Sequence, residues 1–200
     1  MRNAEATKER ILEAALAEFS AHGIAGARVD RIAQAARCNK NLIYIYFEDK
    51  ETLFTTVLQR HLVRIHQEQP FTPDDVPGYA ANVFDWARAN PDLMRLLAWS
   101  ALEQPAKGQT ERVEALAAKV AALAEAQNVG RVGTAFPPDF LLVAVMSLAT
   151  AWSVASPFGP AVNPRAAERP AALREDLIEA VRLLAGAGKG KRTQGRNTER

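Results

Sequence analysis

The sequence predicts an all-α protein of about nine helices, and three observations support this prediction. Apolar residues make up 48% of the 200-residue chain and charged residues 24%, which are ordinary proportions for a globular protein. Alanine, a strong helix former, is abundant, whereas β-branched residues are sparse. Apolar residues recur at helical spacing in most segments, and no segment alternates convincingly as a strand does. The length allows one large domain or two small ones.

The positive charge of the chain is concentrated at its end. The net charge is +2, but the tail after Ala187 has five basic residues and one acidic residue, so +4 lies there and −2 remains elsewhere. The overall charge therefore gives no argument for nucleic-acid binding. The single Cys38 excludes an internal disulfide and indicates a reducing cytoplasm. The longest apolar run, residues 140–155, is shorter than the ~18–20 residues of a membrane span, and no secretory signal is visible.

The first fifty residues predict three short helices. The first begins near Thr7, carries an apolar stripe at helical spacing and ends at Gly23. The second covers about residues 29–36. A tight turn follows, and Asn39 is a good N-cap for a third helix that ends near Tyr44. Two short helices joined by a tight turn fit a helix-turn-helix DNA-binding unit.

A longer helical region follows. Asp49 resembles the N-cap of a fourth, long helix, and Pro70 ends that helix. Stretches rich in proline and glycine then separate further predicted helices at about residues 79–90, 92–104, 109–127, 138–155 and 170–186.

This pattern predicts three parts of the chain and an oligomer. The last two predicted helices are apolar over much of their circumference, with Leu142 and Val145 on one and Leu177 and Val181 on the other. We expect these faces to pair with their copies in a homodimeric four-helix bundle. The predicted parts are a helix-turn-helix DNA-binding domain at 1–50, a helical ligand-binding and dimerisation domain at 51–187, and a disordered basic tail at 188–200.

The predicted third helix is too short and too polar on one face to be a core element. Lysine suits phosphates or guanine, asparagine suits adenine edges, and a tyrosine hydroxyl reaches phosphate oxygens. Its apolar residues are expected to hold it against the first two helices. The residues expected to face outward are Asn39, Lys40, Asn41 and Tyr44.

A longer pattern runs through residues 7–54: ILEAALAEFSAHG, then V-x-x-IA-x-AA, then L-I-Y-x-YF-x-x-K-E-x-L. It resembles the N-terminal domain of the TetR family of bacterial transcriptional regulators and covers about a quarter of the chain. The resemblance implies a dimeric repressor of double-stranded operator DNA, whose larger helical domain holds an inducer pocket. It also implies that Lys50, at the start of the fourth helix, contacts phosphate.

The sequence departs from the family pattern around the turn. Arg28 stands where a small hydroxyl residue commonly caps the second helix, and Arg37 and Asn41 stand where glycine is usual or frequent. A left-handed Arg37 would cost roughly 1 kcal/mol. Base specificity is therefore not transferred from relatives. The residues expected to contact DNA are Arg28, Arg37, Asn39, Lys40, Asn41, Tyr44, Tyr46 and Lys50.

Each of these predictions has a structural alternative. Tyr44 could belong to the core, although Leu42 and Ile43 already fill the buried face of the helix. Tyr46 could wedge between the third and fourth helices. The surface lysines and arginines could simply be solvated.

The second domain is rich in large apolar residues, most of which are core by default. Tryptophans and methionines on neighbouring helices could nevertheless line an apolar cavity, with Arg95 helping to orient a bound molecule. The expected ligand is hydrophobic or aromatic rather than highly charged. The candidate pocket residues are Phe84, Trp86, Met94, Trp99, Phe140, Met146 and Trp152.

Catalytic and metal sites are not predicted. His22, His61 and His66 are too dispersed for a metal site, no catalytic set can be argued from spacing, and no cofactor is expected. We expect a cytoplasmic repressor released from a palindromic operator by a small ligand. The alternatives are a helical ligand carrier or enzyme with a vestigial DNA-binding head, and an activator.

Overall fold

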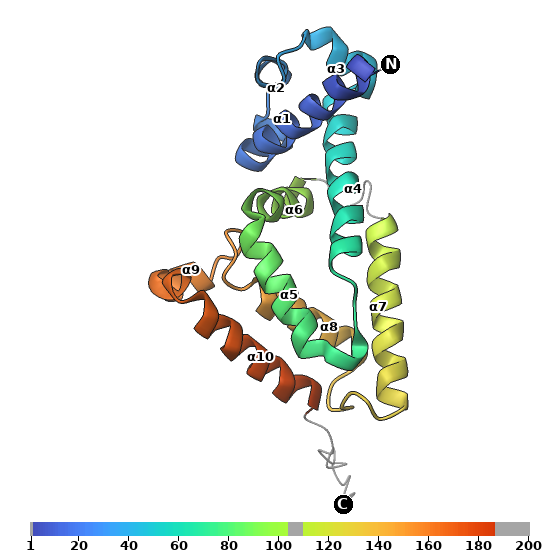
Figure 1. Ribbon diagram of the computed structural model, residues 1–200, viewed down its shortest axis with the longest axis vertical. Helices are drawn as coiled ribbons and strands as arrows, with labels where there is room; N and C mark the ends of the chain where they lie inside the picture. Colours follow the sequence, from blue (N-terminus) through green and yellow to red (C-terminus); the bar gives the residue numbers. More distant parts are fainter. Residues whose placement is uncertain (1, 104–109, 187–200) are drawn as a thin grey trace, which may run out of the picture.

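The computed structural model describes residues 2–103 and 110–186, and all regular structure in these two ranges is helical. The predicted all-α class is confirmed. The predicted tail at 188–200 lies outside the described residues. The molecule is elongated, with α1, α2 and α3 at one end and α5, α7, α8 and α10 towards the other (Figure 1). The long α4 leads from one group to the other.

The order of the elements matches the predicted order closely. Their bounds are α1 (Arg2–Gly26), α2 (Val29–Ala35), α3 (Lys40–Phe47), α4 (Lys50–Glu68), η1 (Pro73–Asp75), α5 (Val76–Ala89), α6 (Pro91–Glu103), α7 (Thr110–Asn128), α8 (Pro138–Thr150), α9 (Gly159–Val162), η2 (Pro164–Glu168) and α10 (Pro170–Gly186).

Several predicted boundaries were wrong. The first helix begins at Arg2 and continues past Gly23, where a positive φ of 65° breaks it before a last short turn. The third helix runs to Phe47, because its buried face continues beyond Tyr44. The eighth helix ends at Thr150, and turns replace its expected last residues. The short α9, η1 and η2 were not predicted, because segments rich in proline and glycine carry no helical periodicity.

Two clusters of buried side chains form the core. The first joins α1, α2 and α3 to the first half of α4, and it includes Phe19 and Phe54, whose rings meet edge to face at 5.1 Å. Leu93 and Leu96 of α6 belong to this cluster as well. The second cluster joins α5, α7, α8 and α10. The helix α6 thus packs against the N-terminal helices, although it follows α5 in the chain.

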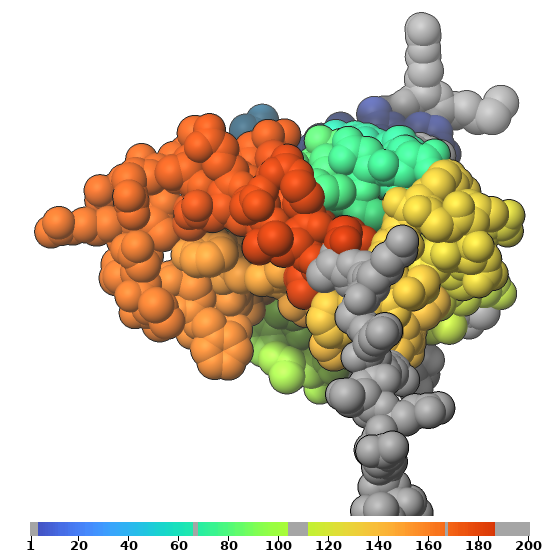
Figure 2. Space-filling view, turned by 90° about the horizontal axis from the view of Figure 1, so that it is seen from below, coloured from blue at the N-terminus to red at the C-terminus, as the bar shows by residue number. Residues whose placement is uncertain are grey.

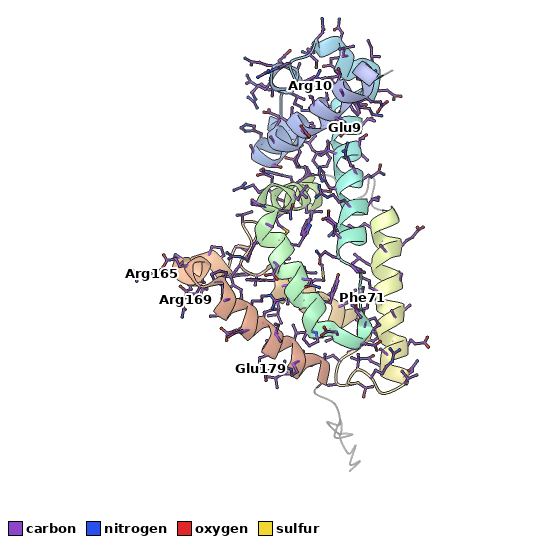
Figure 3. All side chains as sticks on the ribbon, in the orientation of Figure 1. Glu9, Arg10, Phe71, Arg165, Arg169 and Glu179 are labelled. Carbon is purple, nitrogen blue, oxygen red and sulfur yellow. The ribbon has the colours of Figure 1, made fainter. Side chains whose placement is uncertain are left out.

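Charged groups also join α1 to α4. Glu9, labelled in Figure 3, forms an ion pair with Arg60 of α4 at 2.6 Å. The Arg60 side chain holds the pKa of the Glu9 carboxyl below its usual range through a hydrogen bond. Both partners are about half exposed, so this pair adds little stability.

The last two long helices bury their apolar residues in a way that the sequence did not predict. Leu142 and Val145 of α8 and Leu177 and Val181 of α10 were expected at a dimer interface, but they lie in the second core of the same chain. Packing against α5 accounts for this, since one chain already supplies the partner helix. Seen from below, α10 lies across this end of the molecule, and the region of α9 projects to one side (Figure 2).

None of the helices within the described ranges is long and apolar enough to cross a membrane.

Candidate DNA-binding and ligand-binding sites

The helix α3 is fixed at its start and on its inner face. The Asn39 side chain accepts a hydrogen bond from the Asn41 backbone N–H at 2.9 Å, which makes Asn39 the N-cap of α3. Ile43 and Phe47 are buried in the first core, where α3 packs against α2 and α4. The opposite face of α3 carries Asn41 and Tyr44, both of which are exposed.

Arg28 begins α2 without capping it. Its side chain makes no cap hydrogen bond, and its exposed position leaves the guanidinium in solvent. The Glu18 carboxylate of α1 instead accepts a hydrogen bond from the backbone N–H of Arg28 itself at 2.9 Å, which anchors the start of α2 on α1. Burial opposes ionisation of Glu18, but hydrogen bonds from Arg31 and from this N–H hold its pKa below the usual value. The start of α2, which lacks the usual small hydroxyl residue at position 28, is thus held by Glu18 of α1.

Arg37 adopts the left-handed conformation that the family pattern implies, with φ of 51°. Its backbone N–H donates to the Gln34 carbonyl at 3.1 Å, and the Cys38 N–H donates to the Ala33 carbonyl at 3.0 Å. These two bonds define a Schellman motif that ends α2, in which glycine is the usual residue at the Arg37 position. The turn is kept despite the side chain, and the Arg37 side chain is exposed beside α3.

Lys40 is not an isolated charge. Its ammonium forms an ion pair of 2.9 Å with Asp30 of α2, and Asp30 is itself 74% exposed. This carboxylate would face the phosphates that Lys40 was predicted to contact. Tyr44 lies one turn further along α3 and is 43% exposed, whereas Tyr46 is half-buried against the first core. Between them Ile45 is 70% exposed, an apolar residue on the outer face that the sequence did not single out.

Lys50 lies at the start of α4, where its ammonium donates a hydrogen bond of 3.3 Å to the Ala27 carbonyl. This bond joins the first turn of α4 to the segment between α1 and α2. The remaining N–H groups of the ammonium stay available to a phosphate. Lys50 is half-buried and thereby held in one orientation.

A cavity of about 350 Å³ lies in the second half of the molecule. This volume is at the lower end of the range for small-molecule sites, and the walls are mostly apolar. Five helices contribute to it: α4, α5, α6, α7 and α8. The lining residues include Leu62 and Ile65 of α4, Val83 and Trp86 of α5, and Met94 and Leu97 of α6.

The wall of the cavity that α7 supplies carries basic side chains. The Lys119 ammonium of α7 donates to the Tyr79 hydroxyl at 2.7 Å and lies 5.0 Å from the centre of that ring. The Tyr79 hydroxyl in turn donates to the Met146 sulfur at 3.6 Å. Burial raises the pKa of Tyr79 to about 12 and lowers the pKa of Lys119 below its usual value. Arg112 also lines the cavity.

The predicted pocket residues are divided between several places. Trp86, Met94 and Met146 line the cavity. The other four do not, for different reasons that follow from helix geometry. Phe84 is buried in the second core, Trp99 packs against Gly23 of α1, Phe140 stacks on Phe136 at 5.3 Å, and Trp152 lies in the turn after α8 beside Gly159.

Sequence reasoning missed the polar residues of the cavity. Arg95, which was expected to orient a ligand, instead forms an exposed ion pair with Asp92 at 3.0 Å. Tyr79 and Lys119 were not considered, although Tyr79 is the only tyrosine outside the first fifty residues. A lysine within an otherwise apolar, alanine-rich helical stretch was a second available signal. Among the described residues, no group of histidine, cysteine and acidic side chains could hold a metal ion.

The two halves of the chain each match a known family model. Residues 11–57 match the model of bacterial regulatory proteins of the tetR family. Residues 75–182 match the model of the tetracycline repressor-like C-terminal domain. Together the two matches cover most of α1, the helices α2 and α3, and the cavity-lining helices α5 to α8, whereas the part of α4 that lines the cavity lies between them.

Individual proteins are similar over most of the chain. The transcriptional repressor SCO4008 of Streptomyces coelicolor is 43% identical over 159 residues, which are 78% of this chain and 82% of that protein. The transcriptional repressor NicS of Pseudomonas putida is 32% identical over 108 residues, about half of each chain. The crystal structure of the regulator SCO4942 of Streptomyces coelicolor superimposes with a TM-score of 0.80 at 37% identity, covering 90% of this chain and 98% of that one.

Proposed function

Because the chain belongs to the TetR family of bacterial transcriptional regulators, we propose that it is a repressor that leaves its operator when a small molecule fills the cavity. Family membership makes it a DNA-binding regulator that acts as a dimer, rather than an enzyme. Repression is proposed because the relatives SCO4008 and NicS are named repressors. Its place of action is the cytoplasm, where operator DNA lies.

The exposed face of α3 supports the proposed contact with DNA. In this proposal Lys40, Asn41 and Tyr44 enter the major groove, while Arg28, Arg37 and Lys50 meet the phosphates on either side. Asn39 contributes through its cap of α3, and Tyr46 holds α3 against α4. The single observation that carries the proposal is that α3 presents this polar face to solvent while its apolar face is buried.

The dimer is proposed to form through α8 and α10, although not through the residues first expected. Val143 of α8 is 65% exposed and Leu183 of α10 is 62% exposed, and Phe140 lies on α8 near Val143 in sequence. These side chains remain after the inward faces have packed within one chain. In a dimer joined through α8 and α10, the two DNA-binding domains would place their α3 helices in successive major grooves, about 34–36 Å apart.

We propose two domains: residues 1–50 bind DNA, and residues 51–187 bind the ligand and form the dimer. The mostly apolar cavity favours a ligand with a hydrophobic body. Of the seven pocket residues predicted from the sequence, Trp86, Met94 and Met146 are proposed to contact the ligand. The helix α6 is the proposed link, since it lines the cavity with Met94 and belongs to the first core through Leu96.

A gel-shift assay on DNA from upstream of the gene tests the function. Lys40→Ala and Tyr44→Ala should each weaken binding about 10-fold, because each removes a proposed contact worth 1–2 kcal/mol. The salt dependence of binding should be steep, as phosphate contacts require. Sedimentation checks that both variants remain dimers. Unchanged affinity in both variants would remove the proposed DNA-binding face.

A further inference from the structure

The cavity contains a cation without a matching anion. Lys119 is half-buried, and its contacts are the hydroxyl and the ring of Tyr79. No carboxylate among the described residues forms an ion pair with Lys119. The cavity lining includes a second cation, Arg112, and neither aspartate nor glutamate. A charge that loses part of its hydration without gaining a counter-charge carries a free-energy cost, which a bound anion would offset.

The rest of the lining fits the other end of a ligand. The walls from α4, α5 and α6 are apolar and include Ile65, Trp86 and Leu97. Ser147 and Thr150 of α8 supply hydroxyl groups in the same wall. The Thr150 hydroxyl donates to the Met146 carbonyl at 2.8 Å, so its oxygen can only accept from a ligand. The lining therefore combines apolar walls with the basic side chains of α7.

We propose that the cavity binds an amphipathic anion, whose apolar body lies between α4, α5, α6 and α8 and whose anionic group pairs with the Lys119 ammonium. The Tyr79 hydroxyl accepts a hydrogen bond from Lys119 and thereby fixes the direction of the ammonium. This assignment names the ligand class for the cavity of the proposed repressor and rests on that function for its regulatory meaning. It replaces the expectation of a purely hydrophobic or aromatic ligand.

The altered pKa of Lys119 agrees with this assignment. Burial lowers the pKa of Lys119, because the charged form has lost part of its hydration. An anion at 3–4 Å would favour the charged form and reverse that shift. At a pH above the pKa of Lys119 in the free protein, binding of the anion should therefore be accompanied by protonation of Lys119.

Two dyes of the same shape test the charge requirement directly. 1-Anilinonaphthalene-8-sulfonate is an amphipathic anion, and N-phenyl-1-naphthylamine is its counterpart without the sulfonate. Fluorescence titration of the full dimer gives Kd for both dyes. We expect the sulfonate to bind at least 10-fold more tightly, since a charged hydrogen bond in a partly buried site contributes that much. Equal affinities, or tighter binding of the uncharged dye, would overturn the proposal.

Variants assign the effect to Lys119. Lys119→Met keeps the length of the side chain and removes its charge, and it should abolish the preference for the sulfonate; Lys119→Gln should do the same with a different shape. Lys119→Arg should retain the preference. Lys8→Met is the matched control, because Lys8 also lies over an aromatic ring, that of Phe47 at 5.9 Å, but in the DNA-binding head. A preference that survives in both uncharged variants would also overturn the proposal.

Competition by decanoate and by decyl sulfate then identifies the anionic group. Displacement by decanoate alone assigns a carboxylate ligand, displacement by both assigns a general oxyanion site, and displacement by neither contradicts the proposal. Operator binding is measured separately by anisotropy. If the sulfonate dye binds through Lys119 without releasing DNA, the ligand class stands and the repressor mechanism fails. If only the uncharged dye binds and releases DNA, the mechanism stands and the anion assignment fails.

Discussion

The Glu103 carboxylate at the end of α6 accepts a hydrogen bond from the Ile24 backbone N–H of α1 at 2.6 Å and a second from Ala25 at 3.2 Å. These N–H groups become free where Gly23 breaks α1 with its positive φ. Because Met94 of the same α6 lines the cavity, the wall of the proposed ligand site is bonded directly to the DNA-binding head. Two further bonds link these helices, from the Trp99 indole to Ser20 and from the Ser20 hydroxyl to Asp92.

Replacing Glu103 by alanine should weaken the contact between α6 and α1. Glu103→Ala leaves two backbone N–H groups without their acceptor, so we expect a loss of about 1–3 kcal/mol in the free energy of unfolding. Operator release should also require more ligand, because movement of α6 is no longer transmitted fully. Urea denaturation and anisotropy measure the two effects. Glu114→Ala, at an exposed position of α7, is the control. If both variants behave alike, Glu103 has no such role.

Replacing Arg37 by glycine should raise the stability of the protein and at the same time weaken operator binding. The positive φ at Arg37 strains an L-residue, so Arg37→Gly should stabilise the protein by up to about 1 kcal/mol. The same change removes a proposed phosphate contact and should weaken operator binding several-fold with a shallower salt dependence. Thermal unfolding and anisotropy at two salt concentrations check this. Lower stability in the glycine variant would contradict the account of the turn.

Asp30 should restrain operator binding. Its carboxylate pairs with Lys40 and stands where DNA phosphates are proposed to approach. Asp30→Asn removes the negative charge and frees the Lys40 ammonium, so we expect affinity to rise about 3- to 10-fold at low salt. The rise should be smaller in the background of Lys40→Ala, because only the relief of repulsion between Asp30 and the phosphates then remains. An Asp30→Asn variant that binds more weakly would show that the ion pair itself is needed on DNA.

His61 should make stability depend on pH. It lies on α4 beside α6, its Nδ1 is buried, and no hydrogen-bond partner for this atom is found within the described part of the chain. Burial first, and then the charges of Arg60 and Arg64, lower the pKa of His61 below 6.5. The unfolded chain therefore binds more protons than the folded chain just below pH 6.5, so stability falls as pH decreases through that value.

Thermal unfolding between pH 7.5 and pH 5 tests this dependence. We expect the Tm of the wild-type protein to fall by several degrees, and His61→Leu to lose most of that fall. His22→Leu is the control, since His22 is exposed. A wild-type Tm that does not change over this range would refute the role of His61.

The N-terminal helices were predictable because local rules govern them. Asn39 and Asp49 were identified as N-caps from residue type alone, and both accept the expected backbone hydrogen bond. The left-handed geometry at Arg37 was not predictable, because an arginine and a glycine at that position imply different backbones. The contacts of Glu18 with Arg28 and Arg31 depend on packing between α1 and α2, which a single sequence does not reveal.

The cavity was predicted only in part, because helical periodicity does not say which neighbour a face meets. Three of the predicted pocket residues, Trp86, Met94 and Met146, line the cavity. Trp99 lies on the opposite face of α6 and packs against Gly23. Lys119 was missed because it is one of several charged residues on α7, where a solvated lysine is the ordinary expectation. Its contact with Tyr79 joins residues forty positions apart and follows only from the fold.

The most direct test of the account is the affinity of the cavity for its ligand with and without operator DNA. The measurement uses whichever of the two naphthalene dyes binds more tightly, titrated into the dimer alone and into the dimer saturated with its operator. Linkage requires that dye and DNA weaken each other by the same factor, and we predict a factor of about 5 to 150 in both directions. A dye affinity that is the same in both titrations would contradict the proposal that this cavity controls DNA binding.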